Sequence, residues 1–249
     1  MTYKKNFLTL VIVRIDFASP IGDLNKKISA KFDKKALKLF PIKEDAHNIV
    51  ETTLKLTKNG SKIAEEKVNK LWIFHDRKKE KKLELSPTHL DIVLEKYSKY
   101  EELKETFIKI VDVLIDEVED IIIKRFGLRY INEISINDKT ELTNWGKYLN
   151  ENLLSIFKIP GNKDQILRVV HNLIIKYDVF SLVFRYGMFN PDFPAEIKKK
   201  IFVLDYDAYY EGLLDSKDIP KYLDSFHKKI NILFEKNITD ELRKKMGKK

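Results

Sequence analysis

Two arginines on either side of a glycine, near the middle of the chain, are the residues best suited to bind a ligand. The run KRFGLRYINEISI at 124–136 places Arg125 and Arg129 around Gly127. Guanidinium groups present forked donors that match a carboxylate or a phosphate, and the glycine between them leaves space for such a group. In a strand, residues two apart point to the same face, so these three residues would share one face. The spacing indicates a site for an anion or another ligand as one interpretation.

A structural role for the same arginines is the alternative interpretation. They can pair with acidic side chains of the segment that precedes them and so connect a helix to the sheet; the candidates are Asp112, Asp116, Glu119 and Asp120. The opposite face of the strand is core-like, because it carries Phe126, Leu128, Tyr130, Asn132, Ile134 and Ile136. The sequence leaves both interpretations open.

The same spacing occurs a second time in FRYGMF, where Arg185 precedes Gly187. A further arginine, Arg14, lies in an alternating run near the start of the chain. If these arginines faced one cleft, the ligand interpretation would be strengthened. The ligand-binding residues that we predict are therefore Arg125, Gly127, Arg129 and Arg185.

Other chemistry has weaker signals. Asp205 and Asp207 share a strand face, with Glu211 beyond them, and paired carboxylates can bind a hard cation or exchange protons. The five histidines form no metal-binding spacing, and no phosphate loop, dinucleotide motif, nucleophile elbow or kinase signature occurs. Cysteine is absent, which excludes disulfides, thiolate catalysis and cysteine-ligated metals. We predict no catalytic residue, no metal and no cofactor.

The charge of the chain is positive and uneven. Lys and Arg number 47 against 38 Asp and Glu, a formal net charge of +9, and the first 82 residues hold 20 basic and 10 acidic side chains. The basic residues gather at 26–43 and 77–82, with a third group in the last residues. Such patches can bind phosphate or an acidic partner, although most are solvated faces.

The elements that must position these residues follow from periodicity. Alternation predicts strands, and helical spacing predicts helices. A long helix is predicted from a capping box at Ser98 and Glu101 to Val118. The other predicted helices are 24–39, 143–157 with Thr143 as its cap, 218–234 and 238–247. The predicted strands are 8–17, 48–57, 67–76, 81–86, 90–97, 124–136, 165–177, 179–189 and 198–210. No segment has the roughly 20 consecutive apolar residues of a membrane span, and we expect no signal peptide.

The two halves of the chain repeat one order of elements. Residues 1–123 and 124–249 each read as a strand, a helix, several antiparallel strands and a long helix. We therefore expect an α+β fold built from two pseudo-repeats that share one curved sheet and form one compact unit. By analogy of topology this arrangement is similar to helix-grip and TATA-binding-protein-like folds, an analogy that carries no function.

The central run also resembles the marker of a known family. Arg125, Gly127, Leu128, Arg129, Tyr130, Ile131 and Asn132 match the Arg-x-Gly-Leu-Arg-Tyr-Ile-Asn strand of a sporadically distributed prokaryotic family of about this length. Weaker similarity extends to LWIFHD, LSPTHL, LDYDAY and the end of the chain, while a Pro-Pro-x-x-Glu-like segment before the first strand is missing. The resemblance implies a protein without an established activity, of a mobile or defence-associated locus, and it implies no catalytic residue.

These observations favour a cytoplasmic protein that binds a partner, with a protein as the expected partner and no membrane association. Two alternatives remain. The first is a nucleic-acid-associated protein that uses the basic patches 26–43 and 77–82. The second is a binder of a small anion or metabolite at the Arg-x-Gly strands. Oligomeric state and ligand identity are outside what the sequence determines.

Overall fold

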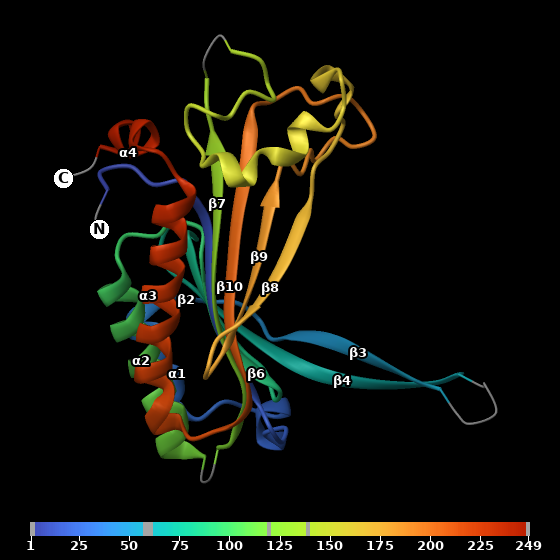
Figure 1. The fold of residues 1–249 in the computed structure, drawn as a ribbon. Coiled ribbons are helices and arrows are strands. Elements are labelled where there is room, and N and C mark those ends of the chain that lie inside the picture. Colours follow the sequence, from blue (N-terminus) through green and yellow to red (C-terminus); the bar gives the residue numbers. More distant parts are fainter. Residues whose placement is uncertain (1–2, 57–61, 119–120, 138–139, 248–249) are drawn as a thin grey trace.

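The computed structural model describes residues 3–56, 62–118, 121–137 and 140–247. It is a mixed α and β fold with one large antiparallel sheet of ten strands and four helices (Figure 1). The helices are α1 (Ala30–Leu39), α2 (Tyr100–Glu117), α3 (Ile219–Asn237) and α4 (Asp240–Met246). The strands are β1 (Leu8–Phe17), β2 (Ile42–Lys43), β3 (His47–Leu56), β4 (Lys62–His75), β5 (Lys81–Leu85), β6 (His89–Leu94), β7 (Ile123–Ser135), β8 (His171–Lys176), β9 (Ser181–Gly187) and β10 (Ile201–Leu214).

The middle of the sheet is the antiparallel pair β1 and β7. The strand order is β2, β4, β5, β6, β1, β7, β10, β9, β8, with β3 paired to β4 off this path. The strands β4, β5 and β6 therefore continue the sheet on the β1 side, and β10, β9 and β8 continue it on the β7 side. The predicted strand over 124–136 is confirmed as β7, and hydrogen bonds to β1 and β10 place it between the two halves.

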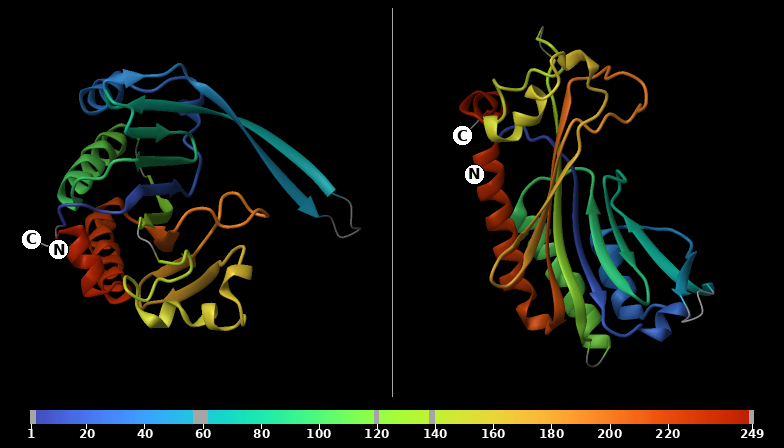
Figure 2. Two further views of the ribbon diagram at one scale, coloured as in Figure 1. Left: turned by 90° about the horizontal axis from the view of Figure 1, so that it is seen from above. Right: turned by 45° about the vertical axis from the view of Figure 1, so that its right-hand side comes forward.

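Three helices cover one face of the sheet, and the alternation of the strands explains why. Val11, Val13 and Ile15 of β1 are fully buried on that face, as are Phe126 and Leu128 of β7. Aromatic stacking continues this core into the helices, with Phe107 of α2 and Phe226 of α3 on either side of Phe126. Figure 2 shows that the sheet bends away from the helices, so its other face is concave.

The helix predicted over 143–157 is wrong. That segment forms only short 3-10 turns, at Glu151–Leu153 and Ser155–Lys158, and Thr143 is a buried residue whose hydroxyl bonds to none of the described groups. Asparagines and a glycine in the segment disfavour a helix, and the indole of Trp145 packs 5.4 Å from the ring of Phe202 at the end of the sheet. The apolar residues of 143–157 have helical spacing because they are packed in the tertiary structure, and this packing does not require a helix.

Smaller differences occur at the ends of elements. The predicted capping box is wrong, since Lys99 is the N-cap of α2 and the Ser98 hydroxyl bonds Glu102 instead. The strand predicted over 165–177 is limited to β8. By contrast, α4 is capped by Thr239 and ends on Gly247 with φ 68°, as its sequence predicts.

The hairpin of β3 and β4 leaves the body of the molecule as a two-stranded arm (Figure 1). The composition of KNGS at 58–61 predicts a turn, and these residues fall outside the described part of the chain. At the other end of the chain, backbone bonds of Lys4 and Lys5 to Gly247 and Met246 hold the two ends together. No helix in the described part of the chain has the length and apolar character needed to cross a bilayer.

Candidate functional site

The concave face of the sheet carries a row of charged side chains that crosses six neighbouring strands. We call this row the charged ladder; it consists of Glu84 of β5, Asp91 of β6, Arg14 and Asp16 of β1, Arg125 and Arg129 of β7, Asp205 and Asp207 of β10 and Arg185 of β9. Alternation places all of them opposite the helices. The structure therefore brings the predicted residues Arg125, Gly127, Arg129 and Arg185 onto one face, together with Arg14.

The tightest contact in the ladder joins Arg129 to Asp205. The guanidinium donates from Nε and Nη2 to the two carboxylate oxygens at 2.8 and 2.7 Å, and Asp205 is only 2% exposed. Arg185 donates to the same carboxylate at 3.3 Å. The hydrogen bonds with Asp205 raise the pKa of Arg129 above its ordinary value. One buried carboxylate thus holds two arginines that lie 56 residues apart in the chain.

Arg125 is held more loosely than Arg129. Its guanidinium lies 3.8 to 4.0 Å from carboxylate oxygens of Asp16, Asp207 and Glu211, and it stacks over the ring of Tyr209 at 5.0 Å. Burial raises the pKa of Asp207, against the effect of the nearby arginines. A guanidinium shared among three distant carboxylates makes no bidentate bond, so Arg125 is the arginine of β7 most able to turn toward another group.

The two glycines of the Arg-x-Gly pairs differ physically. A Cβ on Gly127 would meet only ordinary contacts, with Nη1 of Arg125 the nearest atom at 3.4 Å. Gly187 has φ +139°, and a Cβ there would lie 2.2 Å from the carbonyl oxygen of Val169. The space expected over Gly127 is therefore occupied by Arg125, whereas Gly187 is required by its backbone.

The alternative pairing of these arginines with Asp112 or Asp116 of the preceding helix is wrong. Asp112 and Asp116 lie on α2, on the other side of the sheet, and Asp116 bonds Lys31 at 3.1 Å. Glu119 and Asp120 fall outside the described residues. The arginines pair instead with carboxylates of neighbouring strands, because antiparallel register sets β10 beside β7.

The pairing of β10 with β7 also determines whether Asp205 and Asp207 bind a cation or pair with arginine. Both carboxylates face arginines, and the described residues contain no group of three or more His, Cys, Asp or Glu side chains arranged to hold a metal ion. The cation site suggested by their spacing is therefore an ion-pair network with arginine.

A pair of carboxyl groups lies at the other end of the ladder. Asp91 is 4% exposed and faces Glu84 across the β5 and β6 pair, with Arg14 at 3.5 Å. Burial first, and then the charge of Glu84, raise the pKa of Asp91 to about 7, although Arg14 lowers it. Its Oδ1 bonds to none of the described groups. The ladder therefore changes charge near neutral pH at this end.

Replacing Asp91 with asparagine should stabilise the protein at pH 8, and by a smaller amount at pH 5. The pKa of Asp91 is higher in the folded than in the unfolded chain, so the wild type loses stability as pH rises from about 4 to 7. An uncharged amide avoids that loss, and we expect a gain of about 1 to 2 kcal/mol in the free energy of unfolding at pH 8. Urea denaturation of both proteins at pH 5 and pH 8 measures it; a difference independent of pH would contradict the expectation.

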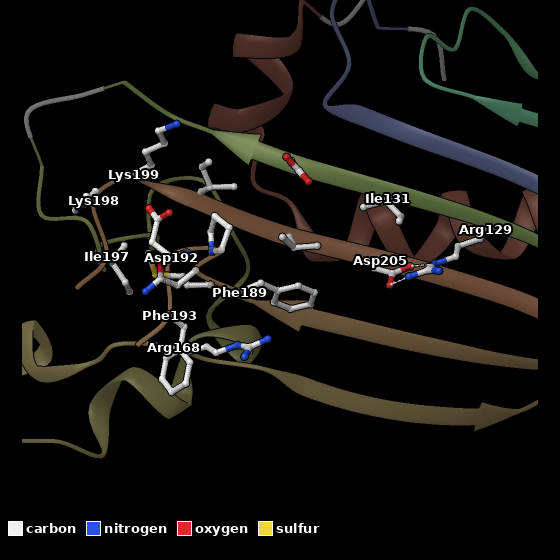
Figure 3. Close-up of a pocket in the computed structure, with 16 residues that line it drawn as sticks. Arg129, Ile131, Arg168, Phe189, Asp192, Phe193, Ile197, Lys198, Lys199 and Asp205 are labelled. Carbon is white, nitrogen blue, oxygen red and sulfur yellow. Dashed lines mark hydrogen bonds and ion pairs between the residues drawn. The ribbon is translucent and has the colours of Figure 1, made fainter. Parts of the chain in front are cut away.

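Two hollows flank the Arg129 and Asp205 pair. One, of about 720 Å³, lies over β5, β6, β1 and β7, with Leu10, Ile12 and Val93 between the charged side chains. The other, of about 530 Å³, lies between β7, β10 and the loop 188–200 (Figure 3). Arg129 lines both. Figure 3 shows Arg129 and Asp205 bonded at one end of the second hollow, with Phe193 and Arg168 at the other.

A second polar cluster lies on the helix side of the sheet, and sequence patterns missed it. The hydroxyl of Tyr130 lies 2.9 Å from Nδ1 of His227 and 3.3 Å from the hydroxyl of Tyr97. Asn231 lies 2.9 Å from the other ring nitrogen of His227, and burial lowers the pKa of His227 to about 4. The helical spacing of His227 and Asn231 was the available signal. The cluster joins α3 to β7 through neutral groups.

A serine and a histidine that resemble a catalytic pair have a structural role. Ser86 lies 2.9 Å from Nδ1 of His89, yet it is fully buried, and its hydroxyl also accepts from the backbone N–H groups of Thr88 and His89. This is a turn stabilised by a serine side chain.

The two basic patches lie next to each other. Ile42 of β2 pairs with His75 of β4, directly before the 77–82 segment. Several of their lysines are already paired with carboxylates: Lys43 with Asp33, Lys81 with Glu102, and Lys82 with Glu84.

No family model matches the chain, and no curated protein matches it either.

Proposed function

We propose that this protein is a non-enzymatic binding protein whose partner, another protein, lies along the concave face of the sheet. The charged ladder carries this proposal. It presents both signs of charge across six strands on the face that the helices leave open, and aliphatic side chains of the 720 Å³ hollow lie beside it. Such a surface recognises a partner of mixed charge and apolar character by complementarity. The side chains best placed to contact it are Arg125, Arg14 and Ile12.

We further infer that the sheet arose from two pseudo-repeats, one before and one after residue 124. Each contributes a first strand at the centre, a meander of further strands and a following long helix, α2 or α3. The order supports the analogy with helix-grip and TATA-binding-protein-like folds. In the described part of the second half no helix corresponds to α1, since the segment in that place forms 3-10 turns.

We also propose that the protein belongs with the sporadically distributed prokaryotic family that its central strand resembles, and that it acts in the cytoplasm. The residues of that motif alternate between the core and the charged ladder, which supports a shared fold as the reason for the motif. A place in a mobile or defence-associated locus is consistent with a binding role.

Replacing Ile12 with lysine should abolish partner binding without unfolding the protein. Ile12 is partly exposed on the concave face, so a lysine there adds charge to the floor of the hollow. Ile232 of α3, 41% exposed on the outside of the molecule, provides the matched control in Ile232→Lys. The experiment is capture of partners from native cells by each protein, with identification by mass spectrometry.

Recovery of one protein by the wild type and the Ile232→Lys control, with at least a tenfold loss for Ile12→Lys, is the expected result. Equal recovery by all three proteins would remove the concave face as the binding site. If nucleic acid is recovered instead, and its binding weakens steeply as salt rises, the basic patches are the site. The adjacency of these patches favours that second candidate function.

A further inference from the structure

The 530 Å³ hollow under the loop 188–200 lies at the end of the concave face that a partner along the charged ladder would leave free. Its floor is formed by apolar residues of β7 and β10, Ile131, Ile201 and Val203, and Phe189 of the loop adds an aromatic wall. A volume of this size is in the range of small-molecule sites, which are mostly apolar with a few polar groups. The hollow is therefore suited to a ligand with an apolar body.

The loop that covers this hollow is held in one conformation by Asn190. The side-chain amide of Asn190 donates to the carbonyl oxygens of Leu167 and Ala195, both at 2.8 Å, and its Oδ1 accepts from the N–H of Asp192 at 3.2 Å. Asn190 has φ 42° and is 9% exposed. Because one of these bonds connects the loop to the segment before β8 and the other two cross the loop itself, the hollow is formed before any ligand arrives.

Four cationic and three acidic side chains line the hollow. The guanidinium of Arg168 lies over the ring of Phe193 at 5.5 Å, and no carboxylate of the described residues lies within ion-pair distance of it. At the opposite end, Arg129 uses two of its five N–H donors on Asp205. Lys198 and Lys199 also line the hollow, as do the acidic residues Glu133 and Asp192. Arg168 is the cation with the most unused bonding capacity.

We propose that this hollow binds a small organic anion with a flat apolar body, such as an aromatic carboxylate. The acid group pairs with Arg168, whose guanidinium is already oriented by the Phe193 ring, and the body lies over Ile131 and Val203. An inorganic anion leaves the apolar floor exposed to water, and a neutral aromatic compound leaves Arg168 unpaired. Both the charge and the ring are needed, and the proposal does not depend on a protein partner.

The test uses indole-3-acetate as the probe, with indole and acetate as its two parts. Isothermal titration and ligand-detected NMR measure binding to the wild type, to Arg168→Gln and to Arg77→Gln. Arg168 and Arg77 are both exposed, so neither change should disturb the fold, and circular dichroism checks this. Arg77 lies in the turn after β4, far from the hollow in the sheet order, and is the matched control.

The expected result is that indole-3-acetate binds the wild type and Arg77→Gln equally, and Arg168→Gln at least ten times more weakly. Indole and acetate alone should each bind at least ten times more weakly than the probe. Equal affinity of Arg168→Gln and wild type would overturn the proposal. So would equal affinity for indole and the probe, or no binding of the probe to any of the three proteins.

Discussion

Replacing Gly187 with alanine is expected to lower the free energy of unfolding by about 4 kcal/mol or more, enough to abolish folding in a marginally stable domain. Gly187 has φ +139°, a conformation essentially restricted to glycine, and the added Cβ would lie 2.2 Å from the carbonyl oxygen of Val169. That atom belongs to the backbone, so the clash cannot be relieved by rotating a side chain. Val169 donates its own N–H to Met188, so a shift also breaks the connection before β8.

Alanine at Gly146 and Gly161 provides the matched control, because a Cβ at either position meets no atom within 4 Å. Gly127→Ala should also be tolerated, with a change of about 1 kcal/mol or less, since its contacts are ordinary. Thermal and urea denaturation of the four variants measure the effect. A Gly187→Ala protein as stable as Gly146→Ala would show that the backbone at Gly187 does not require glycine.

Replacing Arg129 with methionine is expected to lower the free energy of unfolding by about 3 kcal/mol. The change keeps the apolar stem of the side chain but leaves Asp205, 2% exposed, without its bidentate partner. Most of the loss comes from the free-energy cost of a buried carboxylate charge that has lost its partner. Arg185, at 3.3 Å, neutralises that charge only in part. Urea denaturation at pH 7 measures the loss.

The double variant Arg129→Met with Asp205→Asn should recover at least half of that loss, because it removes the uncompensated charge. Lys109→Met is the matched control, since its bond to Glu105 joins two largely exposed side chains and should contribute under about 0.5 kcal/mol. If Arg129→Met is as stable as the wild type, the guanidinium is free to bind an anion, and the ligand interpretation of the central strand is the better one.

Local pattern predicted the elements that have strong periodicity. The alternation of β7 identified which of its residues face the core and which face away, and the apolar stripes of α2 and α3 identified their buried faces. The segment 143–157 failed because its apolar residues have helical spacing for another reason: Trp145 and Phe157 fill the end of the sheet against Phe202. The spacing of apolar residues indicates which side chains are buried, but more than one backbone conformation can bury the same side chains.

The candidate site was predicted in part. Arg125, Arg129 and Arg185 do share one face, but their partners came from strands distant in the chain, and Arg168 carried no signal at all. The two Arg-x-Gly pairs look alike in sequence, yet only Gly187 has a backbone that needs glycine. The residue types of a motif do not determine the φ angle of its glycine.

By itself, the sequence of this protein determined most of its strands, its two long helices and the common face of Arg125 and Arg129, because period and side-chain type are local properties. The tertiary structure alone decided that Asp205 binds both Arg129 and Arg185, that Asp91 lies buried beside Glu84, and that a loop forms a hollow next to Arg168. These contacts depend on which strands pair and in which register, and for strands that are distant in the chain the pairing is decided only when the whole sheet forms.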